Sequence, residues 1–205
     1  MRSIKRMDPE LQTTEICLRS LQLGVPLYYV RNKLKTPELC MEAVKVNIQN
    51  INYVPEDVMT KEMVYYASEL IITNEHTFWN IPNKFKTEDF YIYAIEHVKL
   101  LSNVTVALTM IPIKHRTYGV CLAAVKRYGR ALSVVPKNLK SPIICEEALK
   151  NNGLALRYII NPSIEMCRIA VNQTPKAIKY VPKELLSSLK EEMEEVILWK
   201  KSCLC

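Results

Sequence analysis

The side chains of this sequence that could attack a substrate or hold a metal ion are its cysteines and histidines. Seven cysteines and three histidines occur in 205 residues, and both side chains serve as zinc ligands and in nucleophilic catalysis. The histidines, His76, His97 and His115, share no metal-ligand spacing with one another or with the cysteines. Phosphate-binding glycine loops and zinc-protease motifs are also absent from the sequence. We therefore predict no catalytic residue, no metal site and no cofactor.

Five of the cysteines recur at one position of a repeated pattern. Each is followed by Ala or Ser three residues later and by an apolar residue four residues later, and Val64 and Tyr91 take the same position in two more copies. A position that accepts Cys, Val and Tyr is typical of core packing, because Cys behaves as a small hydrophobe in protein interiors. We predict that these five thiols are buried: Cys17, Cys40, Cys121, Cys145 and Cys167. The alternative is a nucleophilic pair of Cys121 with His115.

The pattern around these cysteines defines a tandem repeat. The three clearest copies begin at Cys121, Cys145 and Cys167 and read CLAAVKRYGRALSVVP, CEEALKNNGLALRYII and CRIAVNQTPKAIKYVP. Extension towards the N-terminus gives about seven units, and the third and fourth are longest, with extra residues within 65–78 and 93–110. A unit of this length cannot bury its apolar face alone, so the units are expected to stack on one another.

The first half of each unit is predicted to be a helix of about ten residues. Cys, Ala and Val at positions i, i+3 and i+4 share one helical face. Several units begin with an N-cap residue, in three of five cases followed by proline: Thr14, Thr36-Pro37, Thr60, Ser141-Pro142 and Asn161-Pro162. Glycines follow three of these helices, and we expect them to end the helix in a left-handed conformation: Gly24, Gly129 and Gly153.

The second half of each unit has six to eight residues before a closing apolar residue, usually followed by proline. It lacks the strict alternation of a strand, so we predict a short helix, and a strand-lined horseshoe is the alternative. The whole chain is then all-α, a right-handed α-solenoid-like array of about seven short helical hairpins. Residues 1–13 form an N-terminal segment, residues 14–187 the array, and residues 188–205 a capping helix with a Cys-x-Cys tail.

The repeat resembles a known family. The unit P-x-x-C-x-x-A-V-K-x-N-G-x-A-L-x-Y-V-P is similar to the DUF4116 family of short tandem repeats, which occurs in giant DNA viruses and in some intracellular bacteria and protists. The resemblance is strongest from Cys121 to Pro182, and it is weaker in residues 36–55 and 60–116. It implies an all-α array and a viral or effector-like setting, and it implies no activity.

The positive charge of the chain is concentrated in one region. The formal net charge is +7, yet no acidic residue occurs between Glu96 and Glu146. Such a run creates a local positive field that attracts polyanions. The candidate polyanion-binding residues in this run are Lys114, Arg116, Lys126, Arg127, Arg130, Lys137 and Lys140.

These observations predict a binding protein and exclude the common enzyme motifs. We expect a non-catalytic protein-interaction scaffold, because repeat arrays present extended surfaces. The alternative is binding of nucleic acid or another polyanion through residues 97–145, and the oligomeric state stays open. Tyrosines recur beside the closing residues of several units, where we expect them to pack with the hydroxyl at the rim; a base-stacking ladder is the alternative. They are Tyr28, Tyr29, Tyr53, Tyr158 and Tyr180.

The ends of the chain bear on its location. No apolar stretch follows the charged start, and the longest one, residues 103–113, is shorter than the roughly 20 residues of a membrane span. We therefore expect an intracellular, reducing compartment and no transmembrane helix. The terminal Cys203 and Cys205 resemble doubly prenylated ends, but we favour a reduced, unmodified tail.

Overall fold

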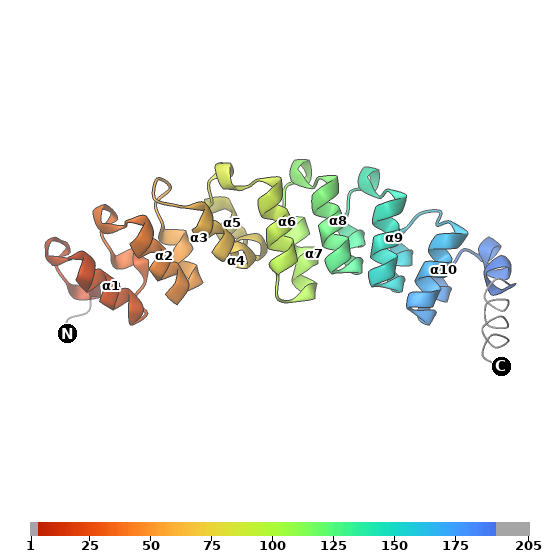
Figure 1. The fold of residues 1–205 in the computed structure, drawn as a ribbon, viewed down its shortest axis with the longest axis horizontal. Coiled ribbons are helices and arrows are strands. Elements are labelled where there is room, and N and C mark those ends of the chain that lie inside the picture. Colours follow the sequence, from red (N-terminus) through yellow and green to blue (C-terminus); the bar gives the residue numbers. More distant parts are fainter. Residues whose placement is uncertain (1–3, 192–205) are drawn as a thin grey trace, which may run out of the picture. The chain divides into compact units, whose positions relative to one another are not determined.

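The computed structural model describes residues 4–191, and residues 1–3 and 192–205 lie outside the described part (Figure 1). Every regular element between residues 4 and 191 is an α-helix or a 3-10 helix, and no strand occurs in that range. The predicted all-α class is confirmed, and the strand alternative is wrong for these residues. The chain divides into two compact units, Met1–Lys99 and Leu100–Cys205.

The first unit contains a succession of short helices. They are η1 (Ile4–Arg6), η2 (Pro9–Leu11), α1 (Thr14–Gln22), η3 (Leu27–Tyr29), η4 (Asn32–Leu34), α2 (Pro37–Val46), η5 (Ile48–Tyr53), α3 (Lys61–Tyr66), α4 (Ser68–Thr73), α5 (Glu75–Asn80), η6 (Asn83–Phe85) and α6 (Glu88–His97). Helix α2 packs on α1, α5 packs on η5, and α6 packs on both α3 and α4. The apolar positions of these helices form the core of the unit.

The second unit repeats a more regular arrangement. Its elements are α7 (Leu101–Met110), η7 (Ile113–His115), α8 (Tyr118–Arg127), η8 (Gly129–Val134), η9 (Lys137–Leu139), α9 (Pro142–Asn151), η10 (Gly153–Tyr158), α10 (Ile164–Gln173) and η11 (Pro175–Tyr180), followed by helical residues 183–191. Helices α8, α9 and α10 pack in succession side by side (Figure 1). The 3-10 helices η8, η10 and η11 form a second row that packs on the first. The second half of these units is therefore a short helix, as predicted, of the 3-10 type.

Most predicted helix starts are confirmed. Thr36, Thr60 and Ser141 are N-caps whose hydroxyl accepts a hydrogen bond from the backbone N–H three residues later. The prediction for Thr14 is wrong by one residue, because Thr13 caps α1. The prediction for Asn161 is wrong, because α10 begins later and Ser163 caps it. Asn161 instead has a φ of 54°, the left-handed conformation that asparagine tolerates better than most residues.

The irregular third and fourth sequence repeats differ from the other repeats in their second half. Helix α3 ends at Tyr66, and the extra residues form α4 and α5 in place of a single 3-10 helix. In the fourth sequence repeat, the extra residues lengthen the second half into the ten-residue helix α7. The predicted positions of the additional length, 65–78 and 93–110, are confirmed.

The predicted role of two glycines is wrong. Gly24 has a φ of 81° and follows α1 in the left-handed conformation, as expected. Gly129 and Gly153 have no positive φ; they are buried first residues of η8 and η10. A Cβ atom on Gly129 would lie 2.3 Å from the Ala148 carbonyl oxygen of the next helix, and one on Gly153 would lie 2.1 Å from that of Ala170. These glycines allow successive repeats to approach at the backbone.

Side-chain amides join successive repeats at the same place. The Asn151 side chain accepts a hydrogen bond from the Gly129 N–H (2.7 Å) and donates one to the Lys126 carbonyl (2.9 Å). One repeat later, Gln173 accepts from the Gly153 N–H (2.5 Å) and donates to the Asn151 carbonyl (3.2 Å). Each amide thus satisfies backbone groups at the end of the preceding α-helix, which otherwise lack partners.

Candidate interaction surfaces

The five cysteines of the repeat phase are buried, free thiols, as predicted. Their exposed fractions are between 0% and 3%. The Cys121 thiol donates to the Arg116 carbonyl (3.8 Å) and that of Cys145 to the Lys140 carbonyl (3.9 Å). Burial raises the pKa of Cys40 and Cys121 to about 11, which keeps both protonated at neutral pH. A protonated, buried thiol is a poor nucleophile, so these observations speak against the pair of Cys121 with His115.

The raised pKa values predict an alkaline loss of stability. The thiols of Cys40 and Cys121 titrate near 9.0 when exposed and near 11 when folded. Their contribution is therefore fully present below pH 9 and is lost as the pH rises towards 11, by about 2–3 kcal/mol per thiol. Cys40→Val/Cys121→Val should flatten this limb of a pH series of urea melts. Burial lowers the pKa values of Lys35, Lys86 and Lys140, and these lysines contribute equally to the wild type and the variant. If stability falls between pH 9 and 11 as steeply in the variant as in the wild type, the two thiols are not the cause.

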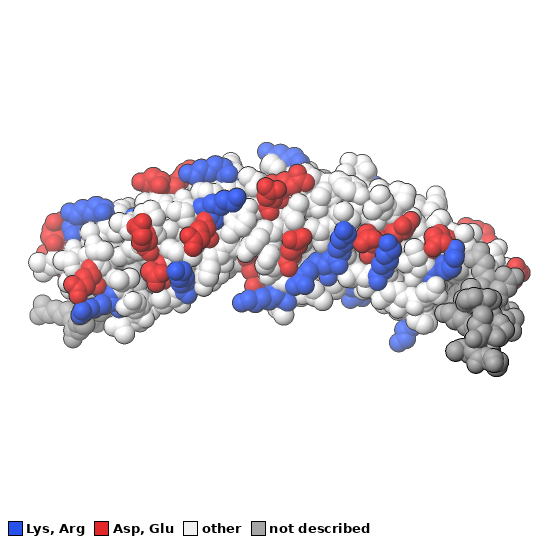
Figure 2. All heavy atoms as spheres, viewed as in Figure 1, with Lys and Arg blue, Asp and Glu red and all other residues white. Residues whose placement is uncertain are grey.

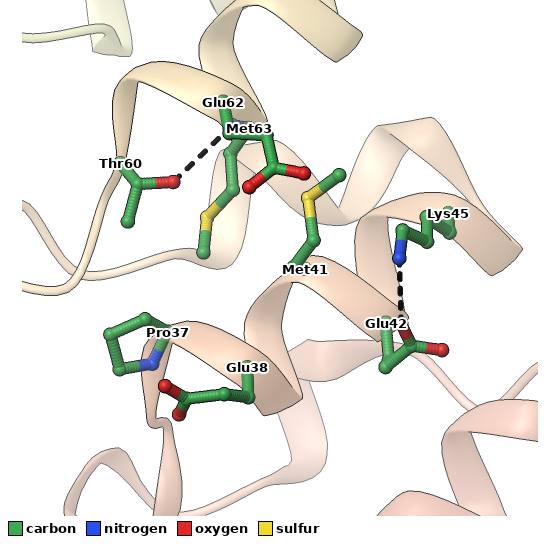
Figure 3. A pocket seen from close by; sticks show the side chains of 8 residues that line it. All are labelled: Pro37, Glu38, Met41, Glu42, Lys45, Thr60, Glu62 and Met63. Carbon is green, nitrogen blue, oxygen red and sulfur yellow. Dashed lines mark hydrogen bonds and ion pairs between the residues drawn. The ribbon is translucent and has the colours of Figure 1, made fainter.

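A groove of about 430 Å³ lies between α2 and α3 in the first unit (Figure 3). Met41 and Met63 lie between the two helices, and Glu38, Glu42 and Glu62 line the groove. Lys45 is paired with Glu42 at 2.9 Å, so the lining carries a net negative charge. Hydrogen bonds from its own backbone N–H and from the Thr36 hydroxyl lower the pKa of Glu38 and keep it ionised. The site combines flexible apolar side chains with carboxylates.

A second cavity of about 460 Å³ in the same unit is lined by aromatic side chains. Tyr66 is 50% exposed at its edge. The His97 ring stacks on Tyr93 with the ring centroids 3.9 Å apart, and Tyr93 lies 4.7 Å from Tyr65. None of the described residues forms a group of three potential metal ligands.

Four of the tyrosines beside the closing residues are partly exposed. Tyr28 and Tyr53 form an edge-to-face pair with ring centroids 5.6 Å apart, and they are 66% and 43% exposed. Tyr158 and Tyr180 are half-buried at the ends of η10 and η11. Partial exposure of these rings fits both interpretations, packing with the hydroxyl at the rim and base stacking.

Two of the predicted polyanion-binding residues bond to backbone carbonyls. Arg116 donates to the carbonyls of Ile111 (2.8 Å), Thr109 (2.9 Å) and Val134 (3.4 Å). The Lys140 ammonium donates to the Tyr158 carbonyl (3.0 Å), and burial lowers its pKa. Both residues directly precede an N-cap, and both reach a carbonyl 18 residues later.

The same bridge occurs in the first unit, where Lys35 donates to the Tyr53 carbonyl (3.0 Å) and Gln12 to that of Tyr29 (3.0 Å). Sequence reasoning missed this role. The signal for it is the polar residue directly before the N-cap, which is present in several units.

Part of the chain matches a known protein family. Residues 119–162, from α8 to the end of the loop after η10, match the family model described as "Domain of unknown function (DUF4116)". This stretch is similar to the DUF4116 family. The predicted resemblance is therefore confirmed for these residues, which include Gly129, Gly153 and the Asn151 amide that joins their repeats. No curated protein and no solved structure matches the chain.

The other predicted polyanion-binding residues lie in or beside the matched residues 119–162, in two groups at the two ends of α8. Lys126 and Arg127 are in the last turn of α8, and Arg130 follows in η8. Lys114 precedes α8 in η7, and Lys137 precedes α9 in η9. Since α8 has ten residues, these two groups are about 15 Å apart along its axis. The structure therefore distributes the basic run over two edges of the second unit.

The face of the second unit that bears α8 and α9 carries mixed charges. Figure 2 shows acidic and basic side chains side by side on the face that bears α8 and α9. Glu147 pairs with Lys150 at 2.8 Å, and the neighbouring Lys126 further lowers the pKa of Glu147. None of the helices between residues 4 and 191 is both long and apolar enough to cross a membrane. Cys203, Cys205 and most of the predicted capping helix lie outside the described residues.

Proposed function

We propose that this chain is a non-catalytic repeat protein that binds another protein. In this proposal its repeats form a right-handed α-solenoid-like array of about seven short hairpins. The protein acts in an intracellular compartment, in the viral or effector-like setting that the resemblance to the DUF4116 family suggests. The succession of packed α-helices and 3-10 helices within the second unit supports the array. The buried, protonated cysteines support the absence of nucleophilic chemistry.

The groove between α2 and α3 is the observation that carries the protein-binding proposal. Met63 is fully buried at its floor and Met41 is half-buried, and methionine adapts its shape to different partners. Glu38 and Glu62 are exposed on its two walls, one from each helix. This arrangement suits a partner segment that places an apolar side chain against Met41 and a lysine or arginine between the carboxylates.

The test is an affinity capture with the full chain, in the presence and absence of nuclease. We expect a protein partner that is retained after nuclease treatment. Glu38→Lys/Glu62→Lys should weaken its retention by about tenfold or more, because like charges then oppose one another. Glu56→Lys/Asp57→Lys is the matched control, since it makes the same change of charge at exposed loop positions of the same unit. Loss of the partner on nuclease treatment, or equal retention by both variants, would contradict the proposal.

Polyanion binding through residues 97–145 is the second candidate. Lys126, Arg127 and Arg130 support it, because all three are exposed and lie within a few residues of one another. Arg116 and Lys140 weaken it, because their donors already bond to carbonyls within the unit. Protein binding therefore remains the function that the geometry supports best.

A further inference from the structure

The 3-10 helices of the second unit present an ordered row of side chains. In a 3-10 helix, the side chains of residues i and i+3 point in the same direction. In η8, η10 and η11 the first, third and fourth positions pack inward for the most part, and the second and fifth positions face outward. We call these outward positions the 3-10 row: Arg130 and Ser133, Leu154 and Arg157, and Lys176 and Lys179. All are exposed except Leu154, which is half-buried.

The charge of the 3-10 row is exclusively positive. The segment 128–182 contains three acidic residues, and all of them lie on α9 or α10: Glu146, Glu147 and Glu165. Glu147 and Glu165 are paired there with Lys150 and Arg168. Within residues 4–191, the four cations of the row form no ion pair. Among the described residues, no carboxylate pairs with the row, so its positive charge is available there to a ligand.

Aromatic rings lie directly beside these cations. The Arg157 guanidinium is 4.6 Å from the centroid of the Tyr158 ring and donates to the Tyr158 hydroxyl. It also hydrogen-bonds the Tyr180 hydroxyl, which links η10 to η11. The Lys179 ammonium lies 4.9 Å from the centroid of the Tyr180 ring. In each of two neighbouring repeats, a cation of the 3-10 row thus lies against a tyrosine ring.

We propose that the 3-10 row binds single-stranded nucleic acid. Arg130, Arg157, Lys176 and Lys179 would neutralise phosphates, and unpaired bases would stack on the Arg157 guanidinium and the tyrosines. An acidic peptide or a lipid headgroup would use the charges but not the stacking groups. A duplex keeps its bases stacked internally and would not use them either. This inference does not rest on the protein-binding groove, which lies in the other unit.

The first unit contains a natural uncharged counterpart of this row. In η5, the second and fifth positions are Gln49 and Asn52. The same 3-10 scaffold therefore folds with neutral side chains at the outward positions. The substitutions that copy this counterpart into the row are Arg157→Asn, Lys176→Gln and Lys179→Asn.

The experiment measures binding of the full chain to a fluorescent single-stranded RNA of mixed sequence by anisotropy, over a series of salt concentrations. Each phosphate neutralised on a single strand contributes about −0.7 to the slope of log affinity against log salt. Four contacts predict a slope of about −3, and hence about 50-fold weaker binding when the salt concentration is raised fourfold. The triple variant should bind about tenfold or more weakly, with a slope near −1.

Two further variants distinguish binding by the row from a general attraction to positive charge. Lys114→Gln/Lys126→Gln/Arg127→Gln removes the same number of charges outside the row and should retain most of the affinity. Tyr158→Leu/Tyr180→Leu should lower the affinity by about fivefold or more while leaving the salt slope unchanged, because stacking is not electrostatic. Circular-dichroism melts of all variants confirm that they are folded before binding is compared.

Several results would overturn the proposal. These are the absence of binding at low salt, a larger loss from the control variant than from the row variant, and unchanged affinity of the tyrosine variant. Equal or tighter binding of duplex DNA, polyglutamate or vesicles with anionic lipids would also overturn it, since these ligands share only the charge. Preference for the single strand, lost in the row and tyrosine variants alone, is the result that supports it.

Discussion

Replacing Gly153 by alanine should lower the free energy of unfolding of the second unit by about 3 kcal/mol, the upper end of the range for overpacking a core. The new Cβ atom would lie 2.1 Å from the carbonyl oxygen of Ala170 and 3.0 Å from its carbonyl carbon. Both atoms belong to the backbone of α10, so no rotamer change can relieve the clash. The repeats must separate, and the hydrogen bond from the Gly153 N–H to Gln173 would be strained with them.

The matched control is Gly24→Ala, because Gly24 is required by its backbone conformation and not by a close neighbour. Gly24 has a φ of 81°, and no atom lies within 4 Å of the place that an added Cβ would take. Alanine there meets conformational strain alone, of about 1 kcal/mol. Urea denaturation of both variants checks the prediction. If Gly24→Ala proves as costly as Gly153→Ala, close approach of the repeats is not what selects glycine at residue 153.

The glycines after the repeat helices show how far the sequence predicts the fold. A glycine seven or eight residues after the repeat cysteine matches a helix end, and the helices do end there. The residues that end α8 and α9 are Tyr128 and Asn152, which have extended backbones with φ of −149° and −152°. A left-handed cap and a close backbone contact both select glycine, and the contact of Gly129 and Gly153 is made with a residue 17 to 19 positions later. Local pattern cannot distinguish the two causes.

The burial of the repeat cysteines was predictable because it depends on local spacing within one helix. The spacing of Cys, Ala and Val within one helix determines which face is buried, and Cys121, Cys145 and Cys167 all lie in the core as expected. Thr36 and Ser141 were predictable as N-caps for the same reason, since the hydroxyl bonds to an N–H three residues away. Interactions within one turn of helix can be read from one stretch of sequence.

The basic residues that are available to a ligand could not be identified from the sequence, because a count of charges does not show which side chains are already bonded within the fold. The sequence shows where Arg116 and Lys140 are, but their hydrogen bonds reach carbonyls 18 residues later. The 3-10 row was missed because its residues are three apart in elements whose helix type the sequence did not specify. Alignment of the second halves would have revealed Arg157 and Lys179 at one shared position and Arg130 and Lys176 at another, but not that they point outward.

Replacing Cys167 by aspartate should be the most destabilising change at the repeat position, by about 3–5 kcal/mol, because it leaves a buried charge without a partner. Cys167 is fully buried, and burial alone raises the pKa of its thiol. Cys145→Asp should cost less, since the Lys140 ammonium lies close enough to act on the Cys145 side chain. The residue that corresponds to Lys140 before α10 is Pro162, which offers no charge.

The controls and the pH dependence make this comparison decisive. Cys167→Val should cost less than about 1.5 kcal/mol, because Val64 already fills the same position of the repeat with no exposed surface. A buried aspartate has a folded pKa above its unfolded value of about 4, so Cys167→Asp should lose stability as the pH rises from 4 and regain it on acidification. Urea melts at pH values of about 4.5 and 7 test this. Equal stability of the Asp and Val variants at neutral pH would show that the position is not part of the core, and equal losses at residues 145 and 167 would remove Lys140 as the compensating charge.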